Sequence, residues 1–130
     1  MLSRLPRMSS ERTTIMVVDD DPAVCDSLKF ALELEGLTVH TCSSGSELRR
    51  HPDLGQARCR VLDYKMPGMD GFEVLDRLEA DVPVILIAGP VTSSIQERAR
   101  HAGVLHVLEK PLLDSALIDR IREITHGAGR

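Results

Sequence analysis

Aspartates gather at two places where they could do chemistry together. Asp19, Asp20 and Asp21 stand in a row after one apolar run, and Asp63 directly follows another. Ligands of open parallel sheets bind beyond the carboxyl ends of the strands, so we expect these acids to meet in one cleft. Like charges ~4 Å apart repel by about 4 kcal/mol at an effective dielectric constant of 20. A divalent cation that prefers oxygen ligands, such as Mg²⁺, would offset this repulsion.

The same residues also have an ordinary structural interpretation, because an aspartate after a strand often caps a helix. Asp21 precedes Pro22, and this pair is typical of an N-cap followed by the first helical residue. A helix cap needs only Asp21, so capping does not explain Asp19 and Asp20, and these two are the metal candidates. Lys110 alone would be a solvated lysine, but beside these acids it is a candidate contact for a phosphate or another anion.

The elements that must position these residues alternate between short apolar runs and helix-period segments. This alternation is typical of βαβ units and predicts an α/β fold with a parallel sheet. The expected strands are Thr14–Val18, Thr38–Thr41, Cys59–Leu62, Val84–Ile87 and, roughly, Leu105–Leu108. Arg58 and Arg60 weaken the third of these predictions.

Capping signals predict where the intervening helices begin. The first helix is expected to start at Asp21 and Pro22, to present Val24, Leu28, Ala31 and Leu32 on one face, and to stop at Gly36. The next three starts are the pairs Ser44 with Glu47, Asp70 with Glu73, and Ser94 with Glu97. Asp114 is expected to cap a fifth helix, with the stripe Leu117, Ile121 and Ile124 and an end at Gly127.

Composition excludes several classes of protein. The 130 residues predict one domain, over 14–126, between a flexible leader at 1–13 and a short tail at 127–130. A formal net charge of −4 with scattered basic residues disfavours nucleic acid as a direct ligand. The longest apolar stretch is far short of the ~20 residues of a membrane span. Three cysteines without a CxxC pair and a leader without an apolar core predict a cytoplasmic, reducing location.

Four segments between about Thr14 and Ile124 carry a further signal: Val17–Pro22, Leu62–Gly71, Pro83–Ile87 and Glu109–Pro111. In this order they resemble the receiver domain of two-component response regulators, most closely receivers of the nitrogen-fixation and nitrate-response type. The resemblance implies a doubly wound, flavodoxin-like (βα)5 fold: a three-layer sandwich whose parallel sheet has the strand order 2-1-3-4-5.

The resemblance also implies a phosphorylation switch rather than an enzyme with a substrate of its own. Asp63 would accept a phosphoryl group from a histidine kinase or phosphotransfer protein. Asp20, Asp63 and the backbone carbonyl of Lys65 would hold Mg²⁺, with Asp19 acting mainly through metal-bound water. Lys110, in a cis peptide with Pro111, would contact a phosphoryl oxygen. The output would reach a downstream protein or an effector domain outside this chain, and a homodimer could form through the fourth helix, fifth strand and fifth helix.

Two positions depart from the family pattern. Ala88 stands where the family carries a switch serine or threonine, and Val107 stands where it carries a tyrosine or phenylalanine. We therefore expect phosphorylation to move the face of the fourth helix and fifth strand less than in ordinary receivers.

Two alternatives stay open. One is a degenerate receiver that acts as a phosphorylation-independent interaction module. The other is a haloacid-dehalogenase-type phosphatase built on Asp19 and Asp21, although Ala23 stands where that family expects a threonine or valine.

Overall fold

The computed structural model describes residues 13–78, 81–112 and 115–127. Its elements follow one another as strand and helix, with a short 3₁₀ turn, η1, before the third strand. They are β1 (Thr14–Val18), α2 (Pro22–Leu34), β2 (Thr38–Cys42), α3 (Gly45–Arg49), η1 (Leu54–Gln56), β3 (Ala57–Asp63), α4 (Gly71–Asp76), β4 (Val84–Ala88), α5 (Ser93–Ala102), β5 (His106–Glu109) and α6 (Ala116–Gly127).

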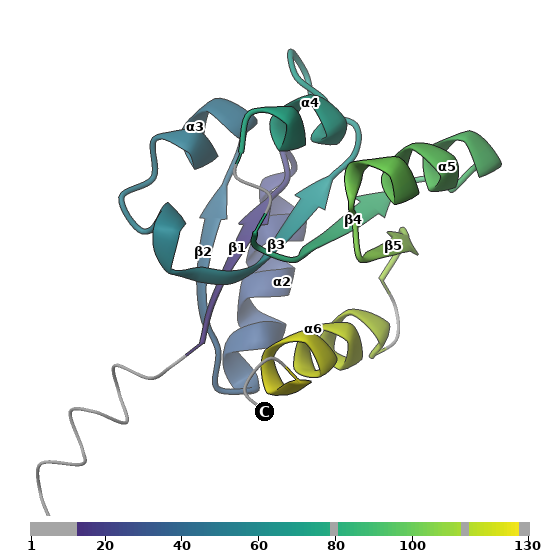
Figure 1. The fold of residues 1–130 in the computed structure, drawn as a ribbon. Coiled ribbons are helices and arrows are strands. Elements are labelled where there is room, and N and C mark those ends of the chain that lie inside the picture. The colour runs from purple at the N-terminus through teal and green to yellow at the C-terminus, as the bar shows by residue number, and fades with distance from the viewer. Residues whose placement is uncertain (1–12, 79–80, 113–114, 128–130) are drawn as a thin grey trace, which may run out of the picture.

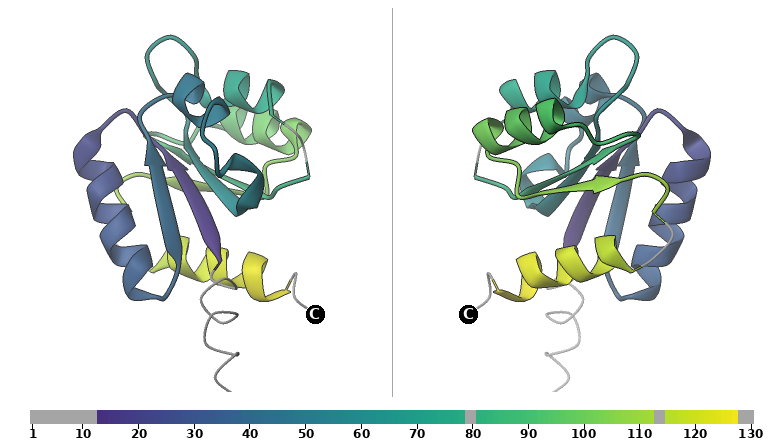
Figure 2. Two further views of the ribbon diagram at one scale, coloured as in Figure 1. Left: turned by 90° about the vertical axis from the view of Figure 1, so that its left-hand side faces the viewer. Right: turned by 90° about the vertical axis from the view of Figure 1, so that its right-hand side faces the viewer.

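The strands form one parallel sheet in the order β2-β1-β3-β4-β5, which confirms the predicted topology. Helices α2 and α6 cover one face, and α3, α4 and α5 cover the other (Figures 1 and 2). The chain is therefore a three-layer sandwich, and the carboxyl ends of β1 and β3 lie side by side at the centre of the sheet.

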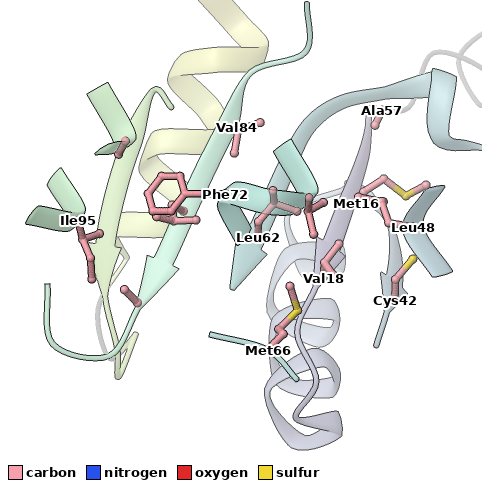
Figure 3. Packing of buried hydrophobic residues seen from close by; sticks show 14 residues of the cluster. Met16, Val18, Cys42, Leu48, Ala57, Leu62, Met66, Phe72, Val84 and Ile95 are labelled. Carbon is pink, nitrogen blue, oxygen red and sulfur yellow. The ribbon is translucent and has the colours of Figure 1, made fainter. Parts of the chain in front are cut away.

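Two hydrophobic cores follow from the two covered faces, because side chains alternate along each strand. Ile15 and Val17 of β1 belong to the core under α2 and α6, whereas Met16 and Val18 belong to the core under α3, α4 and α5. Figure 3 shows this second core, where Phe72 of α4 and Leu62 of β3 lie among the packed side chains. The completely buried β1 and β4 explain why those two strands read as apolar runs.

The predicted strands are correct in number, but several ends differ. β3 extends from Ala57 through Asp63, because Arg58 reaches solvent while Arg60 is accommodated at 3 % exposure inside the sheet. β5 begins at His106 rather than Leu105, whose side chain is 53 % exposed. β2 and β4 each run one residue further, to Cys42 and Ala88.

The predicted helix starts are also largely correct. The Asp21 side chain accepts from the Ala23 N–H, and Asp70 and Glu73 form a complete capping box. The prediction for α5 was wrong by two residues, since the side chain of Thr92 caps that helix and Ser94 lies inside it.

The remaining helix boundaries differ in detail. Ser44 caps α3, but the Glu47 carboxylate bonds to Ser43 instead of completing a capping box. α2 ends at Leu34, before the left-handed Gly36. The predicted cap Asp114 lies outside the described residues. None of the helices in the described part of the chain is long and apolar enough to cross a membrane.

Candidate functional site

The parallel register of β1 and β3 brings three predicted site residues together. Val18 lies opposite Leu62, so Asp19 and Asp63 meet at the carboxyl end of the sheet. One carboxylate oxygen from each of Asp19, Asp20 and Asp63 lies within 4.8 Å of the others. Asp19 and Asp63 are 2 % and 4 % exposed, whereas Asp20 faces solvent. The predicted acidic cleft is therefore present, with two buried acids and an exposed one at its mouth.

Lys110 joins these acids from the end of β5. Its ammonium nitrogen lies 3.0 Å from Asp19 Oδ2 and 3.1 Å from Asp63 Oδ1. Its backbone N–H donates to the carbonyl of Ala88, and the Lys110–Pro111 peptide is cis. One partly exposed ammonium thus bridges two buried carboxylates, and Asp20 adds a further negative charge at the opening.

The electrostatics of the site follow from the sharing of one ammonium group between two carboxylates. Burial, together with the negative charge of Asp19, raises the pKa of Asp63, although Lys110 acts in the opposite direction. Burial also opposes the charge on Lys110, but hydrogen bonds to Asp19 and Asp63 outweigh it and raise the pKa of the ammonium. A raised pKa is expected for both groups, because Lys110 contacts two carboxylates whereas Asp63 lies beside a second carboxylate, that of Asp19.

Asp21 is held apart from the cluster as the cap of α2. Its Oδ1 accepts from the Ala23 N–H at 2.9 Å, while its own N–H donates to Asp19 Oδ1 at 2.9 Å. Asp21 therefore helps to orient Asp19 through its backbone. Its side chain is engaged at the helix start, so the described residues provide no converging Asp19–Asp21 pair of the kind that the phosphatase alternative requires.

The loop after β3 returns to the backbone at the end of that strand. Gly71 donates its N–H to the carbonyl of Tyr64, and a Cβ at Gly71 would lie 2.9 Å from the backbone oxygen of Asp63. Lys65, whose carbonyl the resemblance assigns to the metal, lies in this loop two residues beyond Asp63 with an exposed side chain. Close packing of α4 against the backbone of Asp63 thus fixes the position of this carboxylate.

The two departures from the family pattern lie at the end of β4 and within β5. Ala88 is 1 % exposed at the end of β4 and carries a methyl group in place of a hydroxyl. Val107 is half-buried in β5 and packs against the core under α3, α4 and α5. It also lines a surface hollow of about 360 Å³ together with residues of α5, including Gln96 and Arg100.

Sequence reasoning missed Glu109. Its carboxylate accepts from the Val91 N–H at 3.0 Å and so ties the loop between β4 and α5 to the end of β5. The two residues are 18 positions apart, and no local pattern pairs them. By contrast, the sequence did predict that Lys110 lies beside the acids, although it did not single out Asp19 as a direct partner.

Comparison with known proteins agrees with this geometry. The family model described as "Response regulator receiver domain" matches residues 15–122. The transcriptional regulatory protein FixJ of Azorhizobium caulinodans is 38 % identical over 117 residues, which cover 86 % of this chain and 54 % of that protein. The C4-dicarboxylate transport transcriptional regulatory protein DctD of Pseudomonas aeruginosa is 36 % identical over 120 residues, covering 85 % of this chain and 25 % of that protein.

Solved structures give the same result. The crystal structure titled FixJ-N has a TM-score of 0.76 at 31 % identity and covers 89 % of this chain and 95 % of its own. A CheY-like receiver domain protein from Methanospirillum hungatei has a TM-score of 0.80 at 25 % identity and covers 92 % of this chain and 98 % of its own. Against the curated relatives above, the chain spans only about a quarter to a half of their length.

Proposed function

This chain belongs to the response regulator receiver domain family, and from that premise we propose that it accepts a phosphoryl group on Asp63 in a Mg²⁺-dependent phosphorelay. The donor would be a phosphohistidine on a histidine kinase or phosphotransfer protein of the cytoplasm. The observation that carries the proposal is the shared ion pair of Lys110 with Asp19 and Asp63, set in a cluster of three carboxylates.

The donor set fits Mg²⁺. All three clustered side chains offer hard oxygen ligands, and one lysine leaves their negative charge only partly compensated. We assign the ion to Asp20, Asp63 and the backbone carbonyl of Lys65, with Asp19 acting mainly through water. When bound, Mg²⁺ neutralises charge on the phosphoryl oxygens and on the attacking carboxylate.

The side chains of the chain itself supply the rest of the chemistry. An oxygen of Asp63 attacks phosphorus and forms an O–P bond while the N–P bond to the donor histidine breaks and its electron pair returns to the imidazole. Phosphoryl transfer needs in-line positioning and charge neutralisation. Lys110 already lies 3.1 Å from Asp63 and would transfer its hydrogen bond to a phosphoryl oxygen.

The missing hydroxyl at Ala88 would weaken the response that follows. A hydrogen bond to a charged group contributes roughly 1.5–3 kcal/mol, whereas shifting a two-state switch from 1:99 to 99:1 takes about 5.5 kcal/mol. We infer that phosphorylation of Asp63 displaces the face of α5 and β5 less than in receivers that carry the hydroxyl. The output would pass by protein contact to a target, to an effector domain, or to a second copy through α5, β5 and α6.

A second function is favoured by the same two departures. With Ala88 and Val107 in place of the usual switch residues, the chain could act as a degenerate receiver that signals through its unphosphorylated surface. This alternative needs the fold and the interaction surface but no phosphoryl transfer.

Incubation with acetyl phosphate and Mg²⁺, followed by intact mass measurement, separates the two functions. The phosphorelay proposal expects a mass gain of one phosphoryl group that is absent in Asp63→Asn and absent when Mg²⁺ is chelated. No gain in the folded wild-type protein supports the degenerate receiver, and a gain that persists in Asp63→Asn refutes the assignment of the phosphoacceptor.

A further inference from the structure

A buried thiol lies beside the acidic site and has no part in the chemistry proposed above. Cys25 stands at the start of α2 and is 6 % exposed. Buried cysteines usually pack as small apolar side chains, yet among the described residues Cys25 belongs to neither of the two hydrophobic cores. Instead it lines a cavity of about 220 Å³ together with Asp19, Asp20 and Cys42. Packing in a core therefore does not account for its place.

The sulfur of Cys25 has a specific polar partner. Its S–H donates to the backbone carbonyl of Asp19, with 3.2 Å between sulfur and oxygen. A second carbonyl, that of Cys42, is more distant at 3.9 Å and also accepts from the Asp19 N–H at 3.1 Å. Burial raises the pKa of the Cys25 thiol, so the thiol keeps at neutral pH the proton that it donates. Cys25 is thus a hydrogen-bond donor to the residue that follows β1.

The carbonyl bound by Cys25 belongs to the peptide unit that joins Asp19 to Asp20. A peptide unit is planar, so fixing its oxygen also fixes the direction in which the chain enters Asp20. The Asp19 carboxylate has its own restraints, from the Asp21 N–H and from Lys110. The Asp20 side chain is exposed and has no hydrogen bond or ion pair within the described residues. The position of the Asp20 carboxylate therefore depends on its backbone.

We propose that Cys25 is a positioning residue for the Mg²⁺ site, because its thiol holds the Asp19–Asp20 peptide and so sets the direction of the Asp20 carboxylate. The inference rests on the proposed function, in which Asp20 is a ligand of the ion. Groups that orient a metal ligand through a hydrogen bond change the affinity for the metal when they are replaced. A thiol is a weak donor, so the effect of this one bond should be modest.

The test compares Cys25→Ala with Cys25→Ser in the full chain, labelled with ¹⁵N and ¹³C. The two replacements leave nearly the same space and differ by one hydroxyl donor. Titration with MgCl₂, followed through the amide shifts of Asp20 and Asp63, should give about fivefold weaker binding in Cys25→Ala than in the wild type. Cys25→Ser should recover most of the affinity. The carbonyl ¹³C shift of Asp19 should change in Cys25→Ala and stay near its wild-type value in Cys25→Ser, with or without Mg²⁺.

Cys42→Ala is the matched control, because it removes the other buried thiol that lines the same cavity. It should lower the free energy of unfolding in urea, as Cys25→Ala does, but leave the affinity for Mg²⁺ unchanged. Three results would show that the Cys25 thiol acts only through packing and that the proposal is wrong. They are wild-type affinity in Cys25→Ala, an equal loss of affinity in Cys25→Ser or Cys42→Ala, and an unchanged Asp19 carbonyl shift in Cys25→Ala. A wild type that binds no Mg²⁺ at millimolar concentration refutes the proposed function itself, and this inference with it.

Discussion

The ammonium group of Lys110 lies 3.1 Å from Asp63 Oδ1 and is shared with Asp19 at 3.0 Å. The residue proposed to contact the phosphoryl group is therefore already bound to the proposed acceptor. In this state Lys110 limits the repulsion between two carboxylates that the fold forces together. Binding of Mg²⁺ and phosphorylation would both change how these charges are shared, so the stability of the domain should respond to each of them.

Replacing Lys110 with methionine should destabilise the protein by about 1–3 kcal/mol in the absence of Mg²⁺. Removing one partner of a fully buried ion pair costs roughly 3–5 kcal/mol, and the effect is reduced here because the Lys110 side chain is 29 % exposed. Urea unfolding measures the change. Added MgCl₂ should stabilise Lys110→Met more than the wild type, since the variant has no competing ammonium.

The double variant Lys110→Met with Asp63→Asn serves as the control. It removes one charge of each sign, so it should recover much of the stability lost in Lys110→Met. If the double variant is as unstable as the sum of its single changes, Lys110 acts through packing and not through charge compensation.

The raised pKa of Asp63 predicts a definite dependence of stability on pH. Burial and Asp19 raise this pKa in the folded state. Folding is therefore accompanied by proton uptake on Asp63 at pH values between the ordinary pKa of an aspartate and the raised one. The contribution of Asp63 to stability therefore falls as pH rises through that window. Asp63→Asn lacks this loss, so without divalent ions it should be more stable than the wild type at neutral pH and nearly equal to it at low pH.

Urea unfolding of both proteins across pH 4–8 gives the difference directly, because titration of the shared groups largely cancels. Saturating Mg²⁺ should reverse the order by favouring the ionised wild-type carboxylate. A wild type that gains stability over Asp63→Asn with rising pH, in the absence of divalent ions, would contradict the assigned direction.

The parallel fold was predictable because β1 and β4 are buried on both faces and therefore read as uninterrupted apolar runs. The cluster of Asp19, Asp20 and Asp63 was predictable because parallel strands place their carboxyl ends together. The bond between Glu109 and Val91 was not, because it depends on how one loop lies against another strand. The start of β5 was also not predicted correctly: the strand begins at His106 and not at Leu105, whose side chain is exposed at the edge of the sheet. Residue type alone does not indicate this exposure.

Restoring the hydroxyl at Ala88 should strengthen the switch. The amide chemical shifts of Ser93–Val107 should change little when beryllofluoride is added to the wild type with Mg²⁺, and more when it is added to Ala88→Thr. Ala88→Val has the shape of threonine without the hydroxyl and is the matched control. Large shifts in the wild type, or equal responses of the two variants, would show that this hydrogen bond does not limit the response.

Glu109 should hold the loop between β4 and α5 in place. Its carboxylate accepts from the Val91 N–H, so Glu109→Ala should expose that amide and speed its hydrogen exchange about fivefold to tenfold, corresponding to one hydrogen bond of roughly 1 kcal/mol. Glu109→Gln retains an acceptor oxygen and should keep most of the protection. Equal exchange of the Val91 amide in all three proteins would mean that the bond does not restrain the loop.

Gly71 should tolerate no side chain, because two of the three atoms nearest to an added Cβ are backbone atoms of Asp63 and Tyr64. An added Cβ would lie 2.9 Å from both the Asp63 carbonyl oxygen and Leu86 Cδ1, and the carbonyl cannot move without shifting the proposed phosphoacceptor, Asp63. Gly71→Ala should cost about 1–3 kcal/mol in urea unfolding and also slow phosphorylation by acetyl phosphate. Gly55→Ala is the control, since nothing lies within 4 Å of its added Cβ. If Gly71→Ala matched Gly55→Ala in both measurements, the tight packing of α4 on β3 would not be what positions Asp63.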